Sequence, residues 1–319
     1  MPSFLHRSSH DLAVEAPPDR PLVGIALVLA AGLVFSLADT FSKVLAERLP
    51  VVEITWLRWA GFVVVVAPML VATRGRVLQS GSPQLQAFRA ACLIGSSLLF
   101  VGALSVLPLA STTTINFVSP LIVTALSIPL LGEKVGFRRW AAVAAGLVGV
   151  VVVVRPGSGT FGWAALLPIL SATCWAAGVI ATRRLGGIDR PWTSMTYTSL
   201  IGFVALGLVV PAVFIMPTGF ELLLAAGMAG FATAGQFLTV LAFGRAPVSV
   251  LAPFTYVMLI WATALGYIVF GTVPDGWTWF GAAIIIASGI YTAHRERLRV
   301  RDAARAPVPE LSRADRSQA

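Results

Sequence analysis

Charged side chains are scarce in this chain: they make up 12% of its 319 residues, whereas 57% are hydrophobic. Ordinary soluble domains carry roughly 25% charged residues. A soluble protein of this length cannot bury so much apolar surface in its core, so lipid must be the solvent for much of it. The composition therefore argues against a soluble domain and predicts an all-α integral membrane protein.

Residues that carry out most enzymatic chemistry are also few. The 2 cysteines, Cys92 and Cys174, lie in apolar stretches, and the 3 histidines lie in or beside the two tails. They provide neither a metal cluster nor a nucleophile–base pair inside the membrane. A phosphate-binding loop of the Walker type is also missing from the sequence. We therefore expect no metal site, no cofactor and no enzymatic activity.

Long apolar runs fill most of the remaining sequence. A helix needs about 20 apolar residues to cross the hydrocarbon layer. The uncharged stretch 90–132 is too long for one helix, and Pro108 marks a turn between two. The runs predict ten transmembrane helices, at or within residues 22–44, 51–73, 90–107, 108–132, 140–154, 156–182, 191–220, 222–244, 246–274 and 276–293.

The basic residues predict the orientation of these helices. With the N-terminus in the cytoplasm, only Lys43, Arg48 and Arg155 fall outside, and Arg58 lies within the second span. All other lysines and arginines then fall inside, as cytoplasmic loops require. The net charge of +9 is thus a topological signal, and we expect no nucleic-acid partner. We expect a multi-pass membrane protein, in contact with the lipid bilayer, with both termini cytoplasmic.

The second half of the chain repeats the first at an offset of 139 residues. At this offset Pro108 meets Pro247, Gly132 meets Gly271 and Trp140 meets Trp279. Each predicted half holds five helices, an odd number, so the second half must be inverted relative to the first. The predicted units are a tail at 1–21, a first repeat at 22–155, a second repeat at 156–294 and a basic tail at 295–319.

Four motifs in a fixed order carry a family resemblance. They are Phe35–Lys43 with Trp56–Trp59, then Asn116–Pro120 with Leu131–Lys134, then Ala252–Tyr256 with Gly266–Gly271, and last Ala287–Tyr291. With them the chain resembles the drug/metabolite transporter superfamily, specifically the bacterial EamA type with two five-helix repeats. Thr272 departs from the pattern, since the family often has Glu after the glycine.

This resemblance implies a secondary transporter in the inner membrane that works by alternating access. It further implies a small organic cargo, such as an amino acid, S-adenosylmethionine or a riboflavin-like compound. Two other kinds of protein stay open: a membrane enzyme that acts on lipid, and an integral membrane partner that does not transport. The sequence does not fix the oligomeric state.

Ionisable residues inside a membrane are functional candidates because their burial is costly. Asp39 and Lys43 are four residues apart on one face of the first helix, so they can pair with each other. Arg58 in the second helix falls at a similar depth, in the outer third of the membrane. The cluster would attract an anionic group of the cargo; alternatively, Arg58 reaches the outer headgroups or pairs with Asp39 to hold the two helices together.

A second group of candidates lies near the predicted midplane. Asn116 and its repeat-equivalent Thr255 lie near Pro120 and Pro253, which interrupt their helices. Transporter sites often form where helices are broken in this way. We expect substrate-binding roles for a set of residues here that could equally serve packing alone: Asn116, Trp175, Gln236, Phe254, Thr255 and Tyr256.

Acidic residues are missing from the predicted midplane. Proton-coupled carriers usually place a titratable group in the transport pathway. The sequence therefore predicts facilitated diffusion or exchange, or coupling through a carboxylate near a span end such as Asp39.

Overall fold

The computed structural model describes residues 20–131, 137–156, 162–186, 188–246 and 248–305. Throughout these ranges the secondary structure is helical, without a β-strand. The cytoplasmic tails expected at the ends of the chain, and the loop with Glu133 and Lys134, lie wholly or largely outside them. The α-helices are α1 Pro21–Leu45, α2 Val51–Ala72, α3 Pro83–Val106, α4 Leu109–Asn116, α5 Ser119–Leu131, α6 Phe137–Val154, α7 Leu166–Leu185, α8 Pro191–Val209, α9 Gly219–Phe243, α10 Val248–Thr255, α11 Val257–Phe270 and α12 Gly276–Arg305. Short 3-10 helices are η1 Arg76–Leu78, η2 Gly162–Ala165 and η3 Val210–Ala212.

Within the described residues, 8 helical segments are long and apolar enough to cross a membrane. Two of them are built from two α-helices each, α4 with α5 and α10 with α11. The apolar part of α6, Trp140–Val154, is shorter, and α12 combines an apolar first part with a basic last part. The fold is thus all-helical with multiple spans, while the count of ten stays a prediction.

The breaks inside the two composite spans occur at equivalent places. Both α4 and α10 have 8 residues, and α4 ends at Asn116 just as α10 ends at Thr255, 139 residues later. Pro120 cannot donate an N–H to the carbonyl of Asn116, because proline has none. Pro120 thus contributes to the break between α4 and α5, close to where the sequence predicted it, whereas Pro253 lies inside α10.

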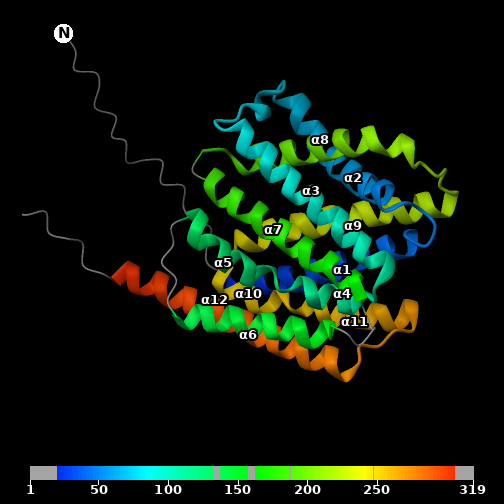
Figure 1. The fold of residues 1–319 in the computed structure, drawn as a ribbon. Helices are drawn as coiled ribbons and strands as arrows, with labels where there is room; N and C mark the ends of the chain where they lie inside the picture. The colour runs from blue at the N-terminus through cyan, green and yellow to red at the C-terminus, as the bar shows by residue number, and fades with distance from the viewer. Residues whose placement is uncertain (1–19, 132–136, 157–161, 187, 247, 306–319) are drawn as a thin grey trace, which may run out of the picture.

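The helices run roughly alongside one another, with α1 near the centre of the bundle (Figure 1). The most extensive packing joins α1 to α9 and α3 to α7, followed by α6 to α12 and α2 to α8. Each of these pairs takes one helix from residues 22–155 and one from residues 156–294. The core of the bundle is therefore the interface between the two predicted halves.

Close contact between α6 and α12 depends on two glycines. A Cβ atom placed on Gly281 would lie 2.6 Å from the carbonyl oxygen of Gly149, and one on Gly149 would lie 2.9 Å from Ile285. The backbones approach so closely because neither residue has a side chain, which is the usual way for helices to associate in lipid.

Candidate functional site

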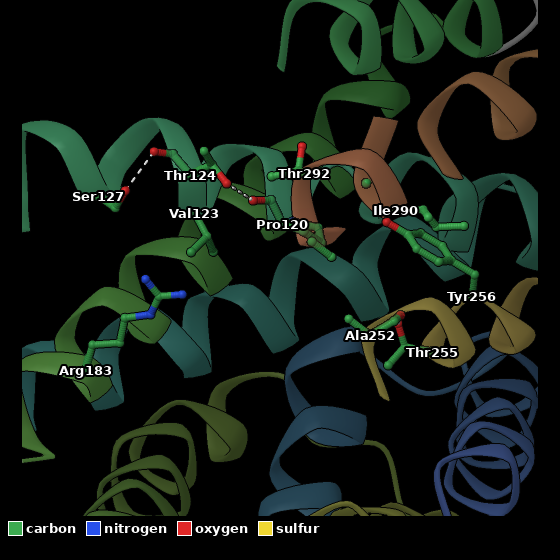
Figure 2. Close-up of a pocket in the computed structure, with 12 residues that line it drawn as sticks. Pro120, Val123, Thr124, Ser127, Arg183, Ala252, Thr255, Tyr256, Ile290 and Thr292 are labelled. Atoms are coloured by element: carbon green, nitrogen blue, oxygen red, sulfur yellow. Dashed lines mark hydrogen bonds between the residues drawn. The ribbon is translucent and has the colours of Figure 1, made fainter. Parts of the chain in front are cut away.

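A cavity of about 280 Å³ lies among α5, α7, α10 and α12, next to the break between α10 and α11. Figure 2 shows its wall, which is mostly apolar with hydroxyl groups and one arginine. The lining residues are Pro120, Val123, Thr124, Ser127, Arg183, Ala252, Thr255, Tyr256, Gly289, Ile290, Thr292 and Ala293. All of them fall between the broken region of the bundle and the ends of the helices that were predicted to be cytoplasmic.

Tyr256 occupies the break itself, at the residue that directly precedes α11. Its ring packs on Phe117, with 4.9 Å between the ring centroids. Phe117 is the repeat-equivalent residue in the break between α4 and α5, so the two breaks meet through their aromatic side chains. The break between α4 and α5 therefore packs against the break between α10 and α11.

Gly289 of α12 provides the space for the phenol of Tyr256. A Cβ atom on Gly289 would lie 1.6 Å from the hydroxyl oxygen of Tyr256 and 2.8 Å from Cζ. Neither distance is compatible with the present position of the ring. Because Gly289 has no side chain, the ring of Tyr256 can occupy its position at the cavity wall.

Arg183 supplies the positive charge of the cavity wall. It belongs to the last turn of α7, is exposed, and lies in Figure 2 at the end of the lining residues opposite Tyr256. No aspartate or glutamate is among the described residues that line the cavity. Among the described lining residues, Arg183 is therefore the one with a charged side chain.

Asn116 lies beside this region with an unused hydrogen-bond acceptor. It is the last residue of α4 and half-buried, and its Oδ1 atom is buried without a hydrogen-bond donor among the described residues. A buried amide oxygen without a donor is costly. Although Asn116 does not line the cavity, it directly precedes Phe117, which packs on Tyr256.

Asp39 and Arg58 form an ion pair between α1 and α2. Arg58 Nη1 donates to Asp39 Oδ1 at 3.2 Å, and the two side chains are 15% and 6% exposed. This is the pairing that the sequence allowed as a structural role for Arg58. The pair stands apart from the cavity described above.

Lys43 is bound to the end of α3. Its Nζ atom donates to the carbonyl oxygens of Leu104 and Leu107, each at 2.7 Å, and lies 5.4 Å from the ring centroid of Phe270. These carbonyls belong to the last turn and the C-cap of α3, where no intrahelical donor is available. In the described contacts, then, Asp39 pairs with Arg58, and Lys43 caps α3.

The structure places the remaining candidates elsewhere. Trp175 is 46% exposed on α7, Phe254 is exposed on α10, and Gln236 is half-buried on α9. The structure thus brings Thr255 and Tyr256 together at the cavity, without Trp175, Gln236 or Phe254. A role in binding for these three stays a prediction.

Of the cavity residues of α5, α7 and α12, Pro120 was expected at a helix interruption, and Gly289 and Ile290 lie in the motif Ala287–Tyr291. Arg183 was counted only as a basic residue of a cytoplasmic loop, and Thr292 is ordinary in an apolar helix. The guides to this region were the prolines and the offset of 139 residues that relates Asn116 to Thr255. Within the described ranges, no three His, Cys, Asp or Glu side chains come together to hold a metal ion.

A family model described as "EamA-like transporter family" matches residues 22–155 and 162–293. The chain belongs to this family. The predicted resemblance is therefore confirmed, and this EamA protein is a multi-pass membrane transporter.

Relatives of known name match this EamA chain over nearly their whole length. The riboflavin transporter of Rhizobium johnstonii is 32% identical, over 91% of the length of this chain and 96% of its own length. The riboflavin transporter of Vibrio cholerae is 31% identical over 88% and 96%, respectively. The S-adenosylmethionine uptake transporter of Rickettsia prowazekii is 25% identical over 86% and 94%.

A solved crystal structure has the same fold. It superposes with a TM-score of 0.61 at 19% sequence identity, over 88% of this chain and 99% of that chain. At this identity the likeness concerns the arrangement of the helices alone.

Proposed function

We propose that this chain is a secondary transporter that carries a small organic metabolite across the inner membrane of a bacterium by alternating access. The observation that carries the proposal is the meeting of two equivalent helix breaks, Phe117 against Tyr256, at the end of a cavity between the two halves. Broken helices at a repeat interface are the usual location of a carrier's binding site.

The packing of the helices supports two inverted repeats. Under the offset of 139 residues α1 corresponds to α7, and α3 to α9, so the contact between α1 and α9 is equivalent to that between α7 and α3. The contacts of α2 with α9 and of α8 with α3 form a second equivalent couple. Such paired contacts are what a twofold relation between the halves would produce. The two stretches matched by the family model, 22–155 and 162–293, lie close to the proposed halves.

A full set of ten spans accompanies this proposal. It needs α6 and α12 to cross as well, and these helices pack along each other (Figure 1). The basic residues then place both termini in the cytoplasm. The first repeat would be 22–155 and the second 156–294, with the tails 1–21 and 295–319 inside.

The proposed substrate site is centred on the cavity and the breaks. Thr255 and Tyr256 would contact the cargo, and Asn116 would use its free Oδ1 atom when the breaks move. Asp39, Arg58 and Lys43 would act in the outer part of the path, where the ion pair and the capped helix join α1 to α2 and α3. Trp175, Gln236 and Phe254 would contact the cargo in other conformations of the transport cycle.

The names of the relatives suggest the cargo. Riboflavin and S-adenosylmethionine are both small heteroaromatic metabolites, and the cavity of about 280 Å³ is near the lower end of the range, roughly 300–1,000 Å³, that ligand sites usually have. We propose facilitated diffusion or exchange, with no cofactor. A role as a lipid-acting enzyme is disfavoured by membership in a transporter family.

Reconstitution of the purified chain tests the proposal. Proteoliposomes should take up radiolabelled riboflavin or S-adenosylmethionine with saturable kinetics, and unlabelled compound inside the vesicles should accelerate entry by exchange. A non-transporting partner subunit or a lipid-acting enzyme would show no saturable entry. A requirement for a pH gradient that persists in Asp39→Asn would contradict the proposed mode of coupling.

A further inference from the structure

Two polar contacts lie at opposite ends of the bundle, and each joins residues of the two proposed halves (Figure 1). At the end where α1 is followed by α2, Arg48 forms an ion pair with Glu221, the third residue of α9, and donates to Met216 O at 3.2 Å. Beside it, Glu53 of α2 accepts a hydrogen bond from the backbone N–H of Ile215 at 3.0 Å. These five residues are called the outer clasp.

The second contact is centred on Asp189, which lies between α7 and α8. Its carboxylate accepts hydrogen bonds from Ser80 Oγ, from Gly81 N–H at 2.8 Å and from Gln86 Nε2 at 2.7 Å. Ser80 and Gly81 precede α3, and Gln86 is its fourth residue. These four residues are called the inner clasp.

The two clasps occupy equivalent positions in the two halves. Since α1 corresponds to α7 and α3 to α9, the contact between the end of α1 and the start of α9 is equivalent to that between the end of α7 and the start of α3. Each clasp connects one half to the other at one end of the bundle. A movement of the halves that opens an end must therefore separate the residues of the clasp at that end.

The two clasps differ in their chemistry. The outer clasp contains an ion pair in which the Arg48 side chain is 48% exposed, whereas the carboxylate of Asp189 is bound by donors without charge. Dissolved salt screens an exposed ion pair. The outer clasp should therefore weaken as the ionic strength rises, and the inner clasp should respond less.

We propose that the two clasps are the gates of the transport path, that each holds its own end of the bundle closed, and that the outer gate is the one controlled by ionic strength. The inference rests on the proposed function, because a path that opens to one side at a time needs a closure at each end.

Two buried alanines report the opening of the ends without any cargo. Ala225 lies one helical turn beyond Glu221 on α9, and Ala90 lies one turn beyond Gln86 on α3; their exposed fractions are 4% and 0%. In a chain whose two native cysteines are replaced by alanine, Ala225→Cys or Ala90→Cys is introduced singly. The rate of reaction with a small thiol reagent in detergent then measures how often each end opens.

Loss of a clasp should raise the rate at its own end alone. We expect Arg48→Gln to speed labelling at position 225 by about 2- to 5-fold, as for the loss of one exposed ion pair, and not to speed it at position 90. Asp189→Asn, which turns an amide toward the donors of the inner clasp, should speed labelling at position 90 and not at position 225. Melting temperatures identify any variant that fails to fold.

Ionic strength provides a test that needs no change at the inner end. Raising the salt concentration from about 0.05 to 0.5 M should speed labelling at position 225, and this effect should be absent in Arg48→Gln. Arg155→Gln is the matched control, because Arg155 forms an ion pair with Asp275 that belongs to neither clasp. Arg155→Gln should leave both rates, and the effect of salt, as in the parent chain.

A disulfide across the inner clasp tests whether this contact must open during transport. A Cβ atom on Gly81 would lie 2.6 Å from Cγ2 of Ile188, which is bonded to Cβ of Ile188, so cysteines at these two positions are within disulfide range. In proteoliposomes, oxidation of the double variant Gly81→Cys, Ile188→Cys should abolish uptake of riboflavin or S-adenosylmethionine, and a reductant should restore it. Each single-cysteine variant should be unaffected by the oxidant.

The outcomes separate this inference from the proposed function. Labelling rates that Arg48→Gln and Asp189→Asn leave unchanged, or raise equally at both ends, would overturn the inference, as would a rate at position 225 that does not respond to salt. Uptake that continues in the cross-linked protein would also overturn it and leave the function standing. A parent chain that takes up neither compound would contradict the proposed cargo, and the labelling rates alone would then decide on the gates.

Discussion

Single charged residues in this chain are stabilised in two different ways. Arg58 pairs with a carboxylate on the neighbouring helix, whereas Lys43 binds carbonyl groups at a helix end. The sequence placed Asp39, Lys43 and Arg58 at one depth, because depth follows from position along a helix. It left the choice of partner open, because pairing across helices depends on how each helix is rotated about its axis.

The ion pair of Arg58 and Asp39 leads to a prediction about stability. Arg58→Ala leaves a buried carboxylate without its partner, a loss that costs about 3–5 kcal/mol in other buried pairs. We expect Arg58→Ala to lower the melting temperature more than the double variant Asp39→Asn, Arg58→Gln, in which no charge is left. Fluorescence-detected melting in detergent measures both. Equal melting temperatures of wild type and Arg58→Ala would show that the pair is not stabilising.

The contact between Gly289 and Tyr256 leads to a prediction about the cavity. Gly289→Ala places a methyl group where the phenol now stands, and overpacking of this kind costs about 1–3 kcal/mol. We expect a lower melting temperature and a higher transport KM. Tyr256→Phe in the same chain removes the closest atom and should restore part of both. Gly230→Ala is the control, since a Cβ there has no neighbour within 4 Å; an equal effect of both alanines would refute the role of Gly289.

At the scale of elements, the broken spans were predictable and the cavity wall was not. The prolines and the repeat offset indicated breaks near Asn116 and Thr255, and α4 and α10 end there. The contributions of α7 and α12 could not be predicted, because a hydrophobic helix shows no apolar stripe in lipid that would tell which side faces inward. The place of Thr292 in the wall became recognisable only when α12 was placed against α10.

The connection between α7 and α8 is joined to the start of α3, and this contact should depend on pH. Asp189 accepts hydrogen bonds from Ser80 Oγ, Gly81 N–H and Gln86 Nε2. Although partial removal from water raises the pKa of Asp189, the hydrogen bonds from Ser80, Gln86 and Gly81 outweigh it and hold the pKa below its ordinary value of 3.8. A carboxyl group with a lowered pKa stabilises the fold above its unfolded-state pKa, and this stabilisation is lost as the pH falls through the folded-state value.

Asp189→Asn should therefore lower the melting temperature at pH 7, by less than Arg58→Ala does, because Asp189 is in contact with water. The difference from the wild type should stay constant down to about pH 4 and shrink only below the ordinary pKa of 3.8. Melting curves at a series of pH values measure this, with Glu47→Gln as a control for an exposed carboxylate. A difference that shrinks between pH 7 and pH 5 would contradict the assigned direction of the pKa.

At the scale of the whole molecule, the number of crossings decides whether the halves are inverted. If α6 crosses the membrane, each half crosses five times, and the second half enters from the opposite side. If α6 lies along the surface instead, α7 starts on the cytoplasmic side, and every later loop changes sides. The connection between α7 and α8 and the one between η3 and α9 therefore carry the decisive information.

Cysteine labelling in intact cells distinguishes the two topologies. After Cys92 and Cys174 are replaced by alanine, single cysteines are placed at Ile188 and Met216, which are both exposed. With ten spans, a membrane-impermeant thiol reagent should label position 216 from outside and reach position 188 only after the cells are opened. If α6 does not cross, this result is reversed. Glu47→Cys should be labelled and Gln79→Cys protected in both cases, since both positions precede α6; they show that the reagent works and that the cells are sealed. Labelling of position 188 in sealed cells would therefore show that the two halves are not inverted. It would also contradict the symmetry on which alternating access through this bundle depends.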